Sequence, residues 1–133
     1  MAEPARGLLD TSVVIDHDVI DHGLLPQETA ISAITLAELA AGPHATTDSA
    51  ERARRTDRLQ WASATWDPLA FDGDAARAFG RVVAAVRVRG RSPRPRVADL
   101  LIAATAVAAG LALYTRNPDD FAGLDDLVQV VGI

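Results

Sequence analysis

Residues 8–15 read Leu8-Leu9-Asp10-Thr11-Ser12-Val13-Val14-Ile15, two apolar runs separated by one carboxylate and two hydroxyl groups. The leucine pair is typical of a short buried strand, and the second run predicts a helix that begins at Thr11 and ends near Ile20. In open parallel sheets, ligands bind beyond the carboxyl ends of the strands. We therefore expect an α/β fold in which Asp10 faces a crevice at that edge of the sheet.

The rest of the chain alternates in the same way between short apolar runs and helix-length segments. This alternation predicts a central, mostly parallel sheet of four to five short strands with helices on both faces. We expect a single domain over residues 1–133, a length that suits one hydrophobic core. Further strands are predicted at 29–31, 66–71, 111–114 and 128–131, helices at 33–41, 46–62, after Asp72 and at 97–109, and a helical turn at 118–121. Ser32 is the predicted N-cap of helix 33–41, and Gly110 is predicted to end helix 97–109.

Composition excludes several classes of protein. The chain has no cysteine, which excludes disulfides and thiolate metal sites, and its three histidines do not have the spacing of a zinc site. A metal, if bound, is therefore expected to be a hard cation held through oxygen. We find neither a run of about 20 apolar residues nor the layout of a signal peptide. We therefore expect a cytoplasmic protein with no membrane partner.

The charge is unevenly distributed. The net charge of −5 argues at first against a nucleic-acid partner, but seven arginines and no acid fall between Ala75 and Ala98. The planar guanidinium suits phosphate recognition, so this basic segment is compatible with a phosphodiester substrate. A high-GC genome is an equally good reason for the absence of lysine, but it does not explain the clustering.

Several acids occupy unexpected places. Glu38 and Asp99 lie inside apolar helical segments, and Asp119 and Asp120 lie in the polar cluster Thr115-Arg116-Asn117-Pro118-Asp119-Asp120 that follows another predicted strand. Because the carboxyl ends of parallel strands share one edge, we expect this cluster and Asp10 to lie in the same crevice. Carboxylates without Cys or His favour Mg²⁺ or Mn²⁺, which activate water for phosphodiester hydrolysis.

Each of these acids also has an ordinary structural explanation. An Asp after a strand is a common helix N-cap, and Thr11 and Ser12 are alternative caps here. A single Glu on a helix is often partly exposed, and an Asp beside a proline is ordinary turn composition. The joint occurrence of the acids is therefore what indicates a site.

In order and spacing, four segments of the chain resemble the PIN domains, and in size the chain is similar to the VapC-type ribonuclease toxins of type II toxin–antitoxin systems. The segments are Leu8 to Asp16, Ser32 to Leu39, Ala98 to Ala106, and Tyr114 to Asn117 with Asp120-Phe121. The resemblance implies a metal-dependent endoribonuclease in which Asp10, Glu38 and Asp99 bind Mg²⁺ or Mn²⁺, with Thr11 or Ser12 assisting. It also implies an RNA substrate, neutralisation by a VapB-type antitoxin, and a homodimer.

The chain departs from this family at two places. Many relatives have an acid where this chain has Asn117. Either Asp119 or Asp120 supplies that charge here, or the site contains only three carboxylates. We favour Asn117 as a residue that orients a ligand or water, with Asp120 nearby. The second departure is Arg94-Pro95-Arg96, where relatives often have small or acidic residues. Candidate RNA contacts are Arg94, Arg96 and Arg116.

Two other classes of function remain open. An aspartyl-phosphate phosphatase would also use an Asp at the end of the first strand, but it normally has a second Asp two residues on and a helper lysine. Position 12 is serine, and the chain has no lysine. A PIN-like binding module that has lost catalysis is the other alternative, and Asn117 is the reason to consider it.

Overall fold

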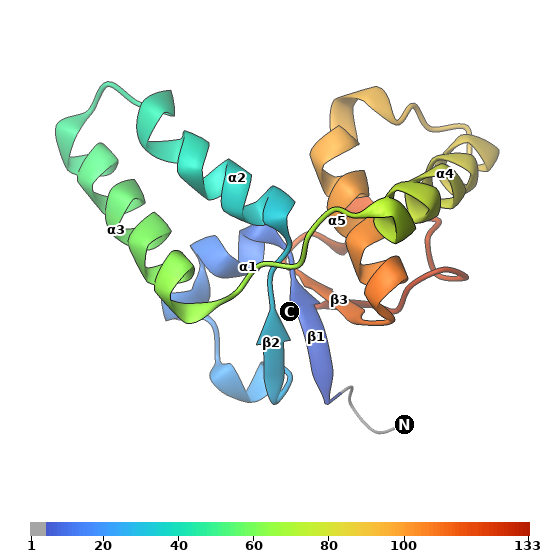
Figure 1. The fold of residues 1–133 in the computed structure, drawn as a ribbon, viewed down its shortest axis with the longest axis horizontal. Coiled ribbons are helices and arrows are strands. Elements are labelled where there is room, and N and C mark those ends of the chain that lie inside the picture. Colours follow the sequence, from blue (N-terminus) through green and yellow to red (C-terminus); the bar gives the residue numbers. More distant parts are fainter. Residues whose placement is uncertain (1–4) are drawn as a thin grey trace.

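The computed structural model describes residues 5–133 and contains one sheet of four parallel strands (Figure 1). The strands are β1 (Arg6–Leu9), β2 (Glu28–Ala30), β3 (Ala112–Thr115) and β4 (Val130–Gly132), in the order β2-β1-β3-β4. The central strand β1 pairs Leu8 with Ala30 of β2 and with Leu113 of β3. The expected parallel sheet of four to five short strands is confirmed, and both β1 and β3 end at the same edge.

Five α-helices surround the sheet. They are α1 (Thr11–Ile15), α2 (Ala33–Ala41), α3 (Ser49–Thr65), α4 (Gly73–Val88) and α5 (Val97–Ala109). Shorter 3-10 helices span His17–Val19, His22–Leu24, Gly42–Ala45, Arg94–Arg96 and Pro118–Phe121. The Ser32 side chain caps α2 by accepting from Thr35 N–H, and Gly110 ends α5 in the left-handed region at φ 67°. The predicted bounds of α2 and α5 are therefore confirmed.

Alternating side chains of the sheet build two separate cores. Leu8 and Leu113 pack with α4 and α5, whereas Leu9 and Tyr114 pack on the opposite face with α1, α2 and α3. The two groups of helices lie on opposite sides of the sheet in Figure 1. Helices on both faces, as predicted, leave the carboxyl edge of the strands as the place where polar groups can collect.

The prediction of a strand at 66–71 is wrong. Only Leu69 pairs there, in an isolated parallel bridge with Ser32 that joins Leu69 N–H to the Ile31 carbonyl at 2.9 Å. Pro68 has no N–H to donate to a ladder, and Asp72 caps α4 only three residues after the bridge. The first helix is also shorter than predicted, because a 3-10 turn follows α1. No helix within residues 5–133 is long and apolar enough to cross a membrane.

Gly7 is required by a close approach of β1 to its neighbours. A Cβ atom at this position would lie 2.5 Å from Tyr114 Cε1 and 2.9 Å from Pro26 Cγ. Both neighbours are buried, so they cannot move aside without disturbing the core. We expect Gly7→Ala to lower the free energy of unfolding in urea by about 1–3 kcal/mol.

Gly80 provides the control for this prediction. It lies in α4 with no atom within 4 Å of a built Cβ, so Gly80→Ala should raise the free energy of unfolding by about 0.5–1 kcal/mol. Equal stability of Gly7→Ala and the unchanged protein would contradict the assigned packing.

Candidate active site at the carboxyl edge of the sheet

Asp10 lies directly after β1 and is 4% exposed. Its backbone N–H continues the ladder to the Tyr114 carbonyl at 2.9 Å, and its carboxylate accepts three hydrogen bonds. Thr11 N–H donates to Oδ1 at 2.8 Å, while the hydroxyls of Ser12 and Thr115 both donate to Oδ2 at 2.9 Å. Asp10 is thus both the N-cap of α1 and a buried carboxylate held in one orientation.

The end of β3 supplies the other half of this arrangement. The fully buried Thr115 hydroxyl donates to Asp10 and accepts from Asn117 N–H at 3.0 Å. Ser12 Oγ accepts from Arg116 N–H at 3.1 Å. The expectation that Asp10 and the loop after β3 meet at one edge is confirmed. Asn117 takes part through its backbone, since its exposed side chain makes no capping hydrogen bond.

Glu38 joins Asp10 through a chain of hydroxyl groups. Thr11 Oγ1 donates to Glu38 Oε1 at 2.7 Å and lies 3.0 Å from Thr35 Oγ1. The Thr11 hydroxyl has a single proton, which it donates to Glu38, so Thr35 must be the donor in its contact with Thr11. The Ser32 hydroxyl in turn donates to Thr35 Oγ1 at 3.4 Å. Thr35 was not predicted from the sequence, although the polar residues Ser32, Thr35 and Glu38 recur every three residues on one side of α2 and could have indicated it.

The apolar sequence around Glu38 indicated a helix face that is not solvated, and this indication is wrong, because the Glu38 side chain is exposed. The apolar residues around it in the sequence are mostly alanines, and Ala37, Ala40 and Ala41 are exposed with it. Alanine favours helices without requiring burial, so an alanine-rich segment can have a solvated face. The same apolar pattern correctly indicated partial burial for Asp99.

Asp99 lies in the first turn of α5, after Val97 and Ala98, so it is not the helix cap. Its pKa is raised to about 6, first by burial and then by the negative charges of Asp10, Asp120 and Glu38, with a partial offset from Arg96. Within residues 5–133, the Asp99 carboxyl has no hydrogen bond or ion pair. Four acids from four parts of the sequence therefore act on one another electrostatically at this edge.

The remaining predicted residues are held in different ways. Arg96 Nη1 binds Asp120 Oδ1 at 2.9 Å, and Arg116 Nε lies 3.4 Å from Asp16 Oδ2. Asp119 is exposed and accepts from Arg91 Nη1 only through its carbonyl. Arg94 is exposed. The fold thus brings Asp120 toward the acids, whereas it leaves the Asp119 side chain outside the cluster.

The donor set fits a hard divalent cation that keeps much of its water. Asp99 and the fixed Asp10 offer carboxylate oxygens, and a cation near them would relieve both the burial of an unpaired charge and the repulsion that together raise the Asp99 pKa. In the described part of the chain, however, no three His, Asp or Glu side chains are gathered closely enough to hold a metal directly. Glu38 and Asp120 are engaged by Thr11 and Arg96 instead. Mg²⁺ is commonly bound through one or two carboxylates and several waters, which matches this spacing.

Asp99→Asn is expected to stabilise the protein in metal-free buffer. Since the folded state raises the Asp99 pKa from 3.8 to about 6, the ionised carboxylate destabilises the fold above pH 6. Water screens part of this penalty because the group is partly exposed, so we expect a gain of about 1 kcal/mol at pH 7.5. The gain should shrink as the pH falls through 6 and disappear below about pH 4, where the folded and unfolded forms both bind the proton.

Urea unfolding of both proteins across this pH range, with EDTA present, measures the difference directly. A variant that is no more stable than the unchanged protein at pH 7.5 would contradict the assigned repulsion.

The profile of the PIN domain family matches residues 7–127. The chain belongs to the PIN domain family. This PIN domain is 39% identical over 130 residues to Ribonuclease VapC5 of Mycobacterium tuberculosis strain H37Rv, covering 96% of this chain and 93% of the relative. It is 38% identical over 108 residues to Ribonuclease VapC8 of the same species, covering 78% and 93% of the two chains.

A solved structure agrees with these sequence relatives. A crystal structure of VapBC-5 from M. tuberculosis, a member of the VapBC family of toxin–antitoxin systems, superposes with a TM-score of 0.87 at 37% identity. The match covers 98% of this PIN domain and 100% of the other chain. The resemblance to PIN domains in the four quoted segments is therefore confirmed.

Proposed function

We propose that this protein is a metal-dependent endoribonuclease and the toxin of a toxin–antitoxin pair. The observation that carries the proposal is the meeting of Asp10, Glu38, Asp99 and Asp120 at the carboxyl edge of the sheet, where burial and the charges of the other three acids raise the Asp99 pKa to about 6. Relatives named ribonucleases and a related toxin–antitoxin structure support the assignment of substrate and partner. Acting on RNA, the protein would work in the cytoplasm.

Asp10 and Asp99 are the residues that would hold Mg²⁺ or Mn²⁺ directly, with Glu38 and Asp120 acting through water. The bound metal would supply activation of water and neutralisation of charge on the phosphate. Ser12 and Thr115 keep the Asp10 carboxylate pointed toward this site, and Thr11 does the same for Glu38. Asn117 lies beside Thr115 and is suited to orient water or substrate.

Arginine side chains around the acids would contact the RNA backbone. Arg94 is exposed and free to reach a phosphate, whereas Arg96 and Arg116 would first have to leave Asp120 and Asp16. An antitoxin would neutralise the site by inserting an arginine among the acids, as Arg96 already does toward Asp120 within the chain. A VapB-type antitoxin is the partner we propose, and a homodimer remains our prediction.

The test is cleavage of total cellular RNA by the purified protein with Mg²⁺ or Mn²⁺, followed by mapping of the product ends. We expect discrete cuts that disappear in EDTA and return when excess metal is added. Cuts of equal intensity in EDTA would contradict metal dependence and indicate a contaminating nuclease.

A binding module without catalysis is the second candidate, and the amide at Asn117 together with the exposed Glu38 favours it. Calorimetric titration with Mn²⁺ separates the two candidates. Metal binding together with cleavage supports the enzyme, whereas RNA binding without metal binding or cleavage supports the module.

A further inference from the structure

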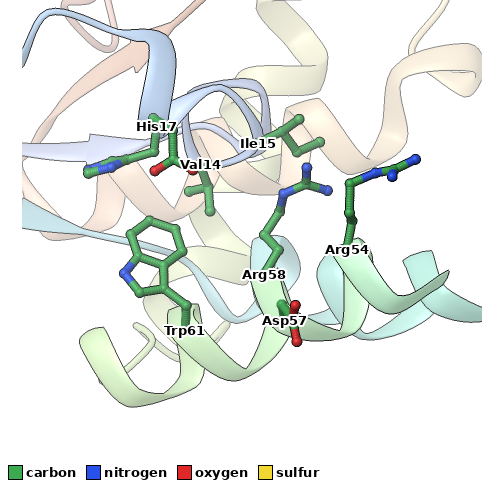
Figure 2. A pocket seen from close by; sticks show the side chains of 8 residues that line it. Val14, Ile15, His17, Arg54, Asp57, Arg58 and Trp61 are labelled. Carbon is green, nitrogen blue, oxygen red and sulfur yellow. The ribbon is translucent and has the colours of Figure 1, made fainter. Parts of the chain in front are cut away.

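A hollow of about 390 Å³ lies between α1 and α3, beside the candidate active site (Figure 2). Its walls include Ile15 of α1, His17 of the following turn, and Arg58 and Trp61 of α3. A second hollow of about 330 Å³ shares Ile15 and Arg58 with the first and reaches Thr11 and Glu38. The two hollows, here called the α1–α3 trough, therefore run from Glu38, at the near side of the candidate site, to the Trp61 ring.

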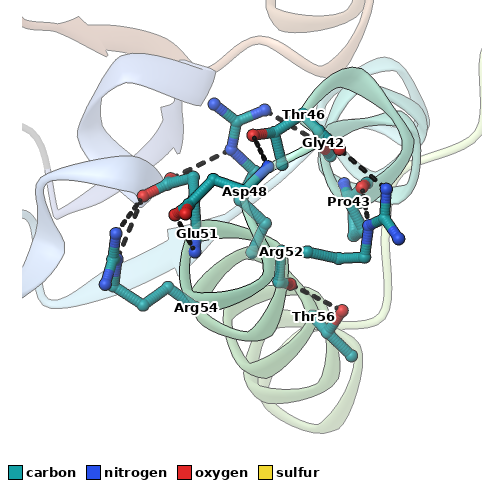
Figure 3. A network of polar contacts seen from close by, with 9 residues as sticks. Gly42, Pro43, Thr46, Asp48, Glu51, Arg52, Arg54 and Thr56 are labelled. Atoms are coloured by element: carbon teal, nitrogen blue, oxygen red, sulfur yellow. Dashed lines mark hydrogen bonds and ion pairs between the residues drawn. The ribbon is translucent and has the colours of Figure 1, made fainter.

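Arg58 is the one arginine of α3 without a partner in the described structure. The other three arginines form hydrogen bonds or ion pairs in the network that Figure 3 shows. Arg54 and Arg55 bind the Glu51 carboxylate, and Arg52 donates to the Pro43 carbonyl at 3.0 Å. No hydrogen bond or ion pair of the Arg58 guanidinium is found in residues 5–133, although the group points toward Ile15 at the junction of the two hollows.

Beyond Arg58 the trough ends in an aromatic surface. Trp61 is 36% exposed, and its ring centroid lies 4.9 Å from that of His17 and 5.0 Å from that of Trp66. Trp66 is itself fixed by a 3.0 Å hydrogen bond from Nε1 to Thr29 Oγ1. Trp61 is thus an accessible ring held against a rigid support, which is the arrangement on which unpaired nucleobases stack.

We propose that the α1–α3 trough binds the single-stranded RNA that flanks the cleaved bond, with Arg58 on a phosphate and Trp61 stacked on a base. This inference rests on the proposed ribonuclease function and assigns that function a substrate-binding subsite. Asp18 and Asp57 also line the first hollow, and Glu51 lines the second. Asp18 and Asp57 are both exposed, and Glu51 is neutralised by its two arginines, so Arg58 is, among the described residues, the cation without a partner at the junction of the two hollows.

An apolar partner helix would fit this trough less well than RNA does. Such a helix needs a continuous apolar groove for its hydrophobic positions. In the second hollow, only Ile15 and Leu39 are large apolar residues, and the other long side chains are charged. In the first hollow, the apolar side chains of Val14, Ile15 and Trp61 are interrupted by four charged residues, Asp18, Arg54, Asp57 and Arg58. Along the trough, Glu38 comes first, then the Arg58 guanidinium and then the exposed Trp61 ring. This order corresponds to the cleaved bond beside Glu38, a neighbouring phosphate at Arg58 and a base on Trp61.

The test is binding of a fluorescein-labelled, ten-nucleotide single-stranded RNA of mixed sequence, measured by anisotropy in EDTA. Arg58→Gln should weaken binding and reduce the slope of log Kd against log salt by about one. Trp61→Leu should weaken binding about tenfold or more, whereas Trp61→Phe, which keeps a ring, should retain most of the affinity. Arg6→Gln, at the opposite end of β1, is the matched control for charge and should bind as the unchanged protein does.

Tryptophan fluorescence gives a second readout that a purely structural role would not move. RNA should quench the emission of the unchanged protein, and this quenching should be lost in Trp61→Phe, which retains only Trp66. Thermal melting of each variant identifies any loss of binding that comes from unfolding. Arg58→Gln is the variant less exposed to this problem, because the Arg58 side chain forms no hydrogen bond or ion pair within residues 5–133.

The outcomes also separate this inference from the proposed function. RNA binding and cleavage that are unchanged in both Arg58→Gln and Trp61→Leu would overturn the subsite and leave the ribonuclease proposal intact. Binding that depends on Arg58 and Trp61 without any cleavage in Mg²⁺ would support the subsite and contradict the proposed hydrolysis. Normal RNA binding together with loss of a co-expressed protein partner in these variants would assign the trough to that partner and overturn the inference.

Discussion

Asp10→Asn is expected to reduce metal-dependent RNA cleavage by about 10³-fold or more, because a metal supplies several kcal/mol of transition-state stabilisation. The amide has nearly the same shape as the carboxylate but lacks its charge. Its oxygen can take the place of Oδ2 and still accept from the hydroxyls of Ser12 and Thr115, while the contact of Oδ1 with Thr11 N–H is lost. The fold should therefore persist while the affinity for Mn²⁺ falls.

Initial cleavage rates over a range of Mn²⁺ concentrations, together with a calorimetric Kd for Mn²⁺, measure both effects. Asp125→Asn, which makes the same chemical change at an exposed position away from the acids, is the control and should cleave normally. Cleavage by Asp10→Asn within a factor of a few of the unchanged protein would remove Asp10 from the site.

Thr115→Val should lower cleavage about 10–100-fold, the usual effect of losing a group that orients a metal ligand. Valine has the same shape but no hydroxyl, so Asp10 Oδ2 would lose one donor and Asn117 N–H would lose its acceptor. Since Thr115 is fully buried, we also expect the free energy of unfolding to fall by about 1–3 kcal/mol.

Thr115→Ser restores the hydroxyl and should recover most of the activity. The assay is cleavage of a defined RNA at saturating Mn²⁺, compared with the rate at low Mn²⁺. If Thr115→Val and Thr115→Ser lose activity equally, packing of the Thr115 methyl group, rather than its hydroxyl, is what matters.

Local signals predicted much of the fold. The bounds of α2 and α5 followed from Ser32 and Gly110, residues that cap helices through their own chemistry. The predicted strand at 66–71 failed because an apolar run with a proline satisfies the strand pattern whether or not a neighbouring ladder is available. In the folded chain, Leu69 alone pairs, with Ser32 just after β2, so a single bridge forms in place of a strand.

The candidate site was predictable where topology alone brings residues together. Asp10 and Thr115 meet because parallel strands share a carboxyl edge, a rule that needs no coordinates. The pairing of Glu38 with Thr11, and that of Arg96 with Asp120, depends on how α2 and the turn before α5 settle against that edge. The sequence did not indicate a role for Arg58 and Trp61, because both residues are ordinary on a polar helix. Only the packing of α1 opposite α3 places them in one trough.

The hydrogen bond between Thr115 and Asp10 joins groups 105 residues apart in the chain. During synthesis on the ribosome, Asp10 emerges well before Thr115. Until Thr115 has been made, the Asp10 carboxylate has only two of its three donors, the Thr11 N–H and the Ser12 hydroxyl. The orientation of Asp10 is therefore completed only when β3 pairs with β1, and the cleavage proposed above would begin only after that step.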